Sequence, residues 1–140
     1  MGSASPPHLV TTLLQQLLTN YPQSDKIGDA AYQLGDLYEG RAYKQYRRAA
    51  QYFERDFQWN PNTRDDSRLR AARLYDRQLM ERSRAIELYR DVTTHETDPR
   101  RMQEAQKRVV ISVRLKESKI RIAKILNTKN EECSSFGFQH

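Results

Sequence analysis

The sequence predicts an all-α protein built as a stack of antiparallel helix hairpins, with about six helices in one domain. Apolar residues recur at spacings of three and four along most of its 140 residues, as they do on the buried face of a helix. Five Gly and five Pro are too few for the many turns of an all-β protein. A hydrophobic content of 37% allows a packed core, and a charged content of 30% gives a polar surface.

The helical domain is expected over residues 8–129, after a leader at 1–7 that lacks the apolar run of a secretory signal. The first helix is predicted from Leu9 to Asn20, because its leucines recur at spacings of one, three and four. Tyr21 and Pro22 end it. A second helix is predicted from a cap at Ser24 or Asp25 to about Glu39, where Gly40 breaks the pattern.

Three further helices are predicted from the same helical spacing and from start and stop signals. The third is predicted over 43–59, because a small and aromatic stripe recurs at helical spacing before the stop at 60–62. The fourth is predicted to start between Thr63 and Asp66 and to reach about Met80. The fifth is predicted over 81–94.

The sixth segment is compatible with two structures, a helix and a β-hairpin. Residues 97–99 place a cap and a proline at a helix start. The β-branched run that begins at Val109 is also compatible with a hairpin over 109–126. We favour the helix, because the joint at 116–119 contains no Gly, Asn, Asp or Pro. Residues 130–140 are polar and are expected to form a loose tail.

An internal repeat spans the middle of the chain. Matching residues lie 36 to 38 positions apart: Gly35 and Ala72, Tyr38 and Tyr75, Ala49 and Ala85, Phe53 and Tyr89, Pro61 and Pro99. Two helices with small residues, aromatic residues and a closing proline in this order resemble the tetratricopeptide repeat (TPR) family, whose unit has about 34 residues. Ala31 and Arg68 stand where that family has a tryptophan, so the repeats resemble divergent members.

The resemblance implies a right-handed, TPR-like α-solenoid with repeats at about 24–61 and 62–99 and a half repeat on either side. Short phrases such as those at 21–24 and 104–108 are similar to repeats of bacterial cell-envelope TPR proteins. A solenoid of this kind is typical of a scaffold that binds a peptide or a partner helix on its concave face. The expected groove residues are Asp29, Tyr32, Asp36, Glu39, Leu69, Arg73 and Asp76.

Enzymatic chemistry is not indicated. The sequence has no Gly-rich phosphate loop, no Gly-x-Ser-x-Gly and no His-Glu-x-x-His. Its three histidines lie far apart in the sequence, and the single Cys133 cannot form an internal disulfide. We therefore expect no catalytic residue, no metal and no cofactor.

Charge suggests one alternative function. The net charge is +6, but residues 100–129 carry +8 and the rest of the chain carries −2. A polyanion could bind this basic surface, represented by Arg114, Lys119, Arg121 and Lys124. Nucleic acid is disfavoured, because these residues are spread around the helix and no aromatic residues alternate with them.

The half repeats suggest another alternative. Their apolar faces, with Leu13 and Leu17 near the start and Ile111, Leu115 and Ile122 near the end, are candidates for self-assembly into a homo-oligomer. No apolar run approaches the roughly 18 residues of a membrane span, so we expect a soluble chain. The compartment, cytoplasmic or periplasmic, stays open.

Overall fold

The computed structural model describes the backbone of residues 6–137 and the side chains of residues 6–131. Within this range the chain is all-α, with six helices and no strand. The helices are α1 (Pro7–Asn20), α2 (Ile27–Glu39), α3 (Tyr46–Trp59), α4 (Ser67–Arg77), α5 (Arg82–His95) and α6 (Pro99–Gly137). Residues 1–5 of the predicted leader and 138–140 of the predicted tail lie outside the described residues.

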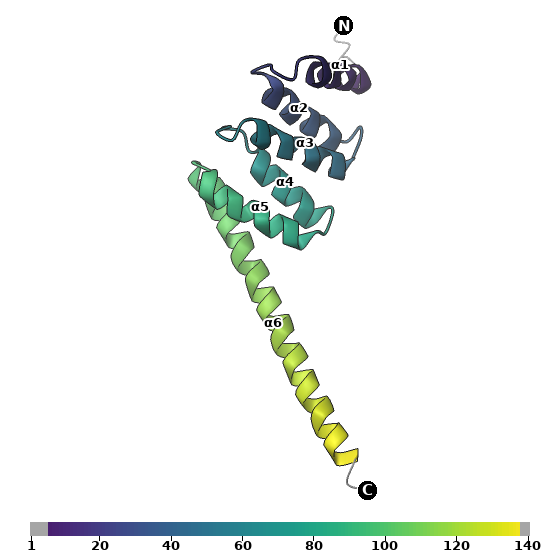
Figure 1. Cartoon of the computed structure of the whole chain (residues 1–140), viewed down its shortest axis with the longest axis vertical. Helices are drawn as coiled ribbons and strands as arrows, with labels where there is room; N and C mark the ends of the chain where they lie inside the picture. The colour runs from purple at the N-terminus through teal and green to yellow at the C-terminus, as the bar shows by residue number, and fades with distance from the viewer. Residues whose placement is uncertain (1–5, 138–140) are drawn as a thin grey trace.

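Each helix packs against the next one along the chain, so the helices form a stack with α1 at one end (Figure 1). Small residues lie where the axes of neighbouring helices approach each other most closely. A Cβ atom at Gly35 on α2 would lie only 2.7 Å from the Phe53 ring on α3. The predicted small residues Ala49, Ala72 and Ala85 are likewise buried, which lets neighbouring helix axes come together.

Aromatic and aliphatic side chains fill the space between the helices. Phe53, Tyr89, Leu34 and Val92 are among the largest fully buried side chains, and Tyr38 is buried with them. These residues come from α2, α3 and α5, so the core runs continuously through the stack. The burial of the predicted aromatic positions is confirmed.

The helix starts differ from the sequence prediction in detail. Asp98 accepts a hydrogen bond from the backbone N–H of Arg100 (2.9 Å), as expected for the start of α6. α3 begins at Tyr46 rather than at residue 43, after a loop in which Lys44 adopts a positive φ of 50°. Asp66 precedes α4 but makes no capping bond, because its carboxylate accepts the Tyr32 hydroxyl instead.

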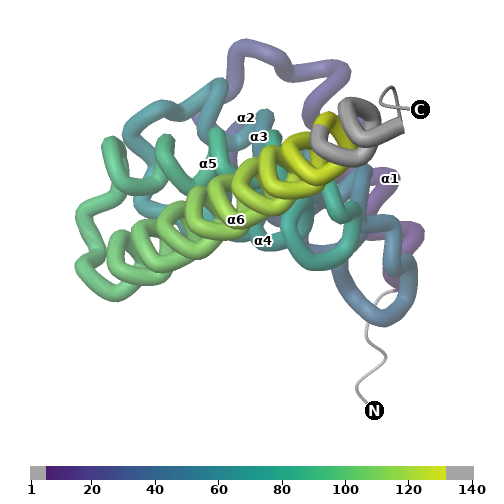
Figure 2. The backbone as a smooth tube through the Cα atoms, turned by 90° about the horizontal axis from the view of Figure 1, so that it is seen from below, coloured from purple at the N-terminus to yellow at the C-terminus, as the bar shows by residue number. Residues whose placement is uncertain are grey.

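The last helix is long and leaves the stack. α6 has 39 residues, so the segment 109–126 is helical and the hairpin alternative is excluded. The predicted loose tail from residue 130 is wrong as far as Gly137, because the absence of any turn signal lets the helix continue. From Val110 to Glu131 nearly every residue is exposed, and the helix projects away from the other five (Figures 1 and 2).

Candidate functional site

The predicted groove residues lie on alternate helices. Asp29, Tyr32, Asp36 and Glu39 belong to α2, and Leu69, Arg73 and Asp76 belong to α4. Asp29 is exposed and approaches Lys26 at 3.7 Å. Leu69 is only 1% exposed and belongs to the core, so its assignment to an open groove is wrong. The helical spacing of three and four could not show which side of α4 faces the interior.

Tyr32 is a packed residue instead of a free aromatic anchor. Its hydroxyl donates a hydrogen bond to Oδ1 of Asp66 (2.7 Å), and its ring meets the Phe53 ring edge-on with centroids 5.5 Å apart. Burial and the neighbouring Asp66 raise the pKa of the Tyr32 hydroxyl, although Arg70 opposes them. Removing this side chain would therefore disturb the fold as well as any binding surface.

Arg70 organises the side chains around Tyr32. Its Nη2 donates to Asp36 (2.7 Å) and to Glu39 (2.6 Å), and its Nη1 donates to the Tyr32 hydroxyl (3.2 Å). The guanidinium also lies over the Phe53 ring, 4.5 Å from its centroid. Burial acts to lower the pKa of Arg70, but its hydrogen bonds to Asp36 and Tyr32 and the charge of Glu39 raise it overall. The sequence argument missed Arg70, which lies 34 positions after Asp36, about one repeat further on.

The pairing continues from α4 to α6. Arg73 holds Glu104 with two hydrogen bonds of 2.8 and 2.6 Å, and these bonds lower the pKa of the Glu104 carboxyl. One helical turn further on, Asp76 accepts a hydrogen bond from Nε of Arg108 (2.9 Å) and another from the Tyr89 hydroxyl (3.2 Å). Acidic and basic side chains thus join α2 to α4 and α4 to α6.

We call this set of pairs the ladder: Arg70 with Asp36 and Glu39, Arg73 with Glu104, and Asp76 with Arg108. Four of the seven predicted groove residues are members of the ladder. Their charges are paired within the chain and join alternate helices, so a partner that bound these charges would have to compete with the ladder.

A different concave region lies where α6 diverges from α5. This α5–α6 groove has a volume of about 700 Å³, within the usual range of ligand pockets. Its lining comes from the end of α4 and the following turn (Asp76, Arg77, Met80), from α5 (Arg82, Ser83, Ile86, Arg90) and from α6 (Arg108, Ile111, Ser112, Val113, Leu115, Lys116, Lys119). The groove combines apolar residues with several cations, and sequence reasoning missed it because it depends on the angle between two helices.

The predicted basic surface lies on the projecting part of α6. Arg114, Lys119, Arg121 and Lys124 are all exposed, and none forms an ion pair with another described residue. At about 100° per residue they face different directions around the helix. Only Lys119 of these four lines the α5–α6 groove.

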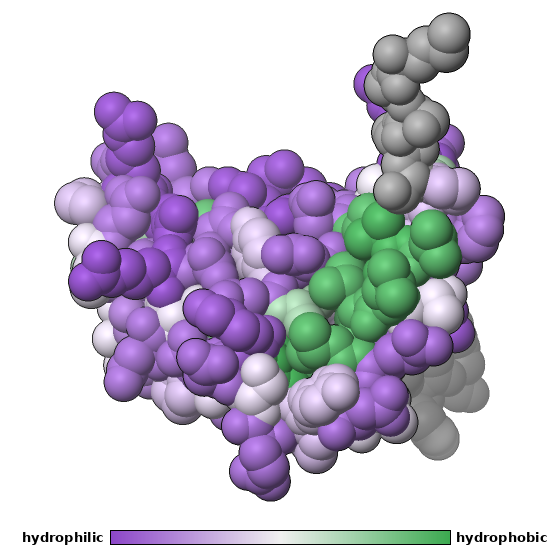
Figure 3. Space-filling view, turned by 90° about the horizontal axis from the view of Figure 1, so that it is seen from above, coloured by the Kyte–Doolittle hydropathy of each residue, from purple (hydrophilic) through white to green (hydrophobic). Residues whose placement is uncertain are grey.

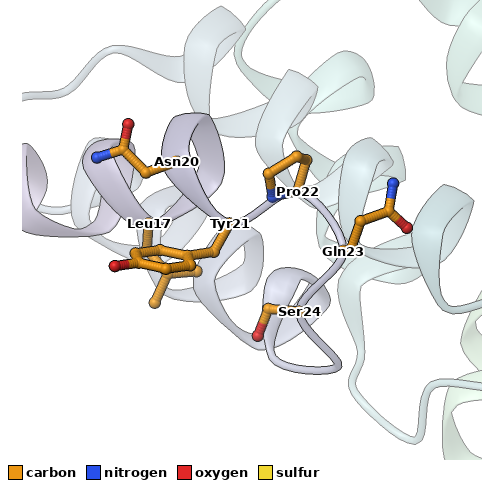
Figure 4. A pocket seen from close by; sticks show the side chains of 6 residues that line it. All are labelled: Leu17, Asn20, Tyr21, Pro22, Gln23 and Ser24. Atoms are coloured by element: carbon orange, nitrogen blue, oxygen red, sulfur yellow. The ribbon is translucent and has the colours of Figure 1, made fainter.

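Two smaller surface features lie near the N-terminal end of the stack. A hollow of about 410 Å³ at the turn between α1 and α2 is lined by six residues from Leu17 to Ser24 (Figure 4). None of these six side chains is charged. Exposed Leu9 and Leu13 lie on α1, at the end of the molecule where Figure 3 shows an apolar patch.

Asp56 is a buried carboxylate with no hydrogen-bond partner among the described residues. Gly28 makes room for it, since a Cβ atom there would lie 3.0 Å from Oδ1 of Asp56. Burial raises the pKa of the Asp56 carboxyl from 3.8 to about 6, although the nearby Ser67 hydroxyl acts in the opposite direction.

This raised pKa has a defined effect on stability. Between pH 4 and pH 6 the folded chain keeps the Asp56 proton that the unfolded chain has lost. Stability from this group is therefore complete below about pH 4 and is lost as the pH rises through about 6. At neutral pH, burial of this carboxylate therefore lowers the stability of the core.

The described residues contain no group of three His, Cys, Asp or Glu side chains that could hold a metal ion. Over the same part of the chain, no helix combines the length and the apolar character required to cross a membrane. The sequence matches no family model, no curated protein and no solved structure. The TPR resemblance therefore stays a prediction, and the function is argued from the geometry alone.

Proposed function

We propose that this chain is a non-enzymatic, TPR-like scaffold that binds a helical segment of a partner protein in the α5–α6 groove. The observation that carries the proposal is a set of exposed apolar side chains gathered in a concave site. Met80, Ile111 and Leu115 are exposed and line the groove together with half-buried Ile86. Apolar residues that remain exposed in a concave site are typical of protein-binding surfaces.

The position of α6 supports the same function. Helices α2 to α5 each pack extensively against a helix before and a helix after them, whereas α6 packs in this way against α5 alone. A partner helix in the groove would give α6 a second neighbour and cover its apolar face. The α5–α6 groove is preferred to the inner face predicted from the sequence, because four residues of that face are paired in the ladder.

Selection from a peptide library displayed on phage, with the full chain as bait, tests this proposal. We expect enriched peptides to lose binding when Leu115→Glu places a charge in the groove. The matched control is Ile122→Glu on the same helix outside the groove, because the two residues are 47% and 58% exposed. Enriched peptides that bind the Leu115→Glu variant unchanged would show that the groove is not the binding site.

Polyanion binding is a second candidate, favoured by the cations on the projecting part of α6 that form no ion pair with a described residue. This function predicts a steep loss of affinity for heparin or duplex DNA as the salt concentration increases. Self-assembly is a third candidate, favoured by exposed Leu9 and Leu13 on α1. Sedimentation of the chain alone would show a mass that rises with concentration.

A further inference from the structure

We propose that the partner segment is an acidic amphipathic helix, with one apolar stripe flanked on both sides by Asp or Glu. This inference rests on the proposed function and specifies the partner's chemistry. The length of the groove, the position of its apolar residues and the placement of its cations all favour such a helix.

The groove is long enough for a short helix. Its α6 wall runs from Arg108 to Lys119, which at about 1.5 Å per residue is about 16 Å, or three helical turns. Its α5 wall runs from Arg82 to Arg90, about two turns. A helix of about 11 residues would match this length, whereas a compact small molecule would leave much of it empty.

The apolar residues lie along the middle of the groove. Ile111 and Leu115 are one turn apart on α6, so their side chains share a face. Ile86 contributes from α5, and Met80 from the turn that follows α4. Methionine adapts its shape to what it contacts, so this wall can accommodate different apolar side chains. A stripe with apolar residues at spacings of three and four fits these residues.

Basic side chains that form no ion pair with a described residue lie on both walls of the groove. Arg82 and Arg90 on α5, and Lys116 and Lys119 on α6, are exposed and form no ion pair with a described residue. The acidic residue in the lining, Asp76, is already bonded to Arg108. A helix in the groove would therefore have two cations along each flank of its apolar stripe, and carboxylates there would be favoured by charge.

The same residues disfavour the other occupants. A second copy would bring either the positive α6 or the α1 segment, which contains no Asp, Glu, Lys or Arg. The α1 segment supplies no carboxylate, and α6 carries ten Lys and Arg against four Glu, so α6 would bring a net positive charge to the four cations. A nucleic acid would supply negative charge, but the lining contains no aromatic side chain for base stacking, and the apolar residues would face a polar backbone.

The test compares two synthetic peptides of about 15 residues and identical composition, rich in Leu and Glu, in binding to the full chain by fluorescence anisotropy. One peptide places its Leu residues on a single helical face, and the other has a scrambled order. A third peptide replaces every Glu of the first by Lys. We expect the acidic amphipathic peptide to bind at least about tenfold more tightly than either of the others.

Two charge-reversed variants locate the site. Lys116→Glu with Lys119→Glu alters the groove, and Arg121→Glu with Lys124→Glu makes the same change in net charge on α6 outside it. We expect the first pair to weaken the acidic amphipathic peptide about tenfold and the second pair to weaken it much less. Circular dichroism checks that both variants keep the helical content of the parent chain.

The other outcomes overturn the inference in distinguishable ways. Equal binding of the scrambled peptide, or equal effects of the two charge reversals, would indicate a general attraction for polyanions. Stronger binding of the Lys peptide that is lost with Leu115→Glu would keep the proposed function and refute the acidic partner. Binding of no peptide, together with a dimer abolished by Leu115→Glu, would assign the groove to a second copy and refute both proposals.

Discussion

Replacing Gly35 by alanine tests the packing between α2 and α3 most directly, because two physical effects oppose each other there. A methyl group at this position would lie 2.7 to 2.9 Å from three carbon atoms of the Phe53 ring, closer than real contacts of this kind. Helix propensity works the other way, since alanine in a helix interior is more stable than glycine by about 1 kcal/mol.

The surroundings of Phe53 determine which effect is larger. Its ring is fully buried, meets the Tyr32 ring at 5.5 Å and lies 4.5 Å from the Arg70 guanidinium. The ring therefore cannot move away without disturbing both contacts, and overpacking of this kind costs about 1–3 kcal/mol. After the gain in helix propensity of about 1 kcal/mol, we expect Gly35→Ala to destabilise the chain by up to about 2 kcal/mol.

Urea and thermal unfolding followed by circular dichroism at the helix band measure this change. A melting temperature lower by up to about 8 °C corresponds to the expected loss. Phe53→Leu in the Gly35→Ala background serves as the control, because a smaller side chain should relieve the contact. The two changes should then cost about 1 kcal/mol less together than the sum of their separate effects. A more stable Gly35→Ala chain would refute the close contact.

Three more changes test the polar groups of the stack. Asp56→Asn should flatten the loss of stability between pH 4 and pH 6 and raise stability at pH 7 by up to about 3 kcal/mol. The melting temperature measured as a function of pH checks this, and a profile parallel to that of the parent chain would contradict the raised pKa of Asp56. Arg70→Ala should lower stability by about 1–3 kcal/mol, because the side chain is only 18% exposed and forms hydrogen bonds with three partners. Lys26→Ala, which removes one member of an exposed ion pair, should change stability by less than about half a kcal/mol. If Arg70→Ala and Lys26→Ala lost the same stability in urea unfolding, the ladder would have no structural role. Tyr32→Phe should cost about 1 kcal/mol in the same measurement by leaving Asp66 without its donor, and an unchanged value would show the hydrogen bond to be dispensable.

Much of the local structure could be predicted from the sequence. The stops at Pro22, Gly40 and Asn60 separate helices that begin and end within a few residues of their predicted bounds. The small and aromatic positions of the repeat, such as Gly35 and Phe53, are buried as expected. These features depend on neighbours within one or two turns, so their physical cause is visible in the order of residues.

The candidate site was less accessible to the same reasoning. Tyr32 and Leu69 have a spacing that fits an exposed inner face, but Tyr32 packs on Phe53 and Leu69 is buried. Helical spacing assigns residues to a common face and does not say what that face contacts. The partners of Arg70 lie 31 and 34 positions away, and only the packing of α2 against the remainder of the stack brings them within bonding distance.

By itself, the sequence predicted an all-α chain, the approximate bounds of its first five helices and the excess of positive charge on the last one, because these follow from composition and local periodicity. Tertiary structure alone decided which charges are satisfied and which are free. The ladder pairs its charges across α2, α4 and α6. Where α6 diverges from α5, Arg82, Arg90, Lys116 and Lys119 form no ion pair with a described residue and lie beside exposed apolar side chains. Angles and distances between helices depend on the whole set of core contacts, which no single segment of the sequence contains.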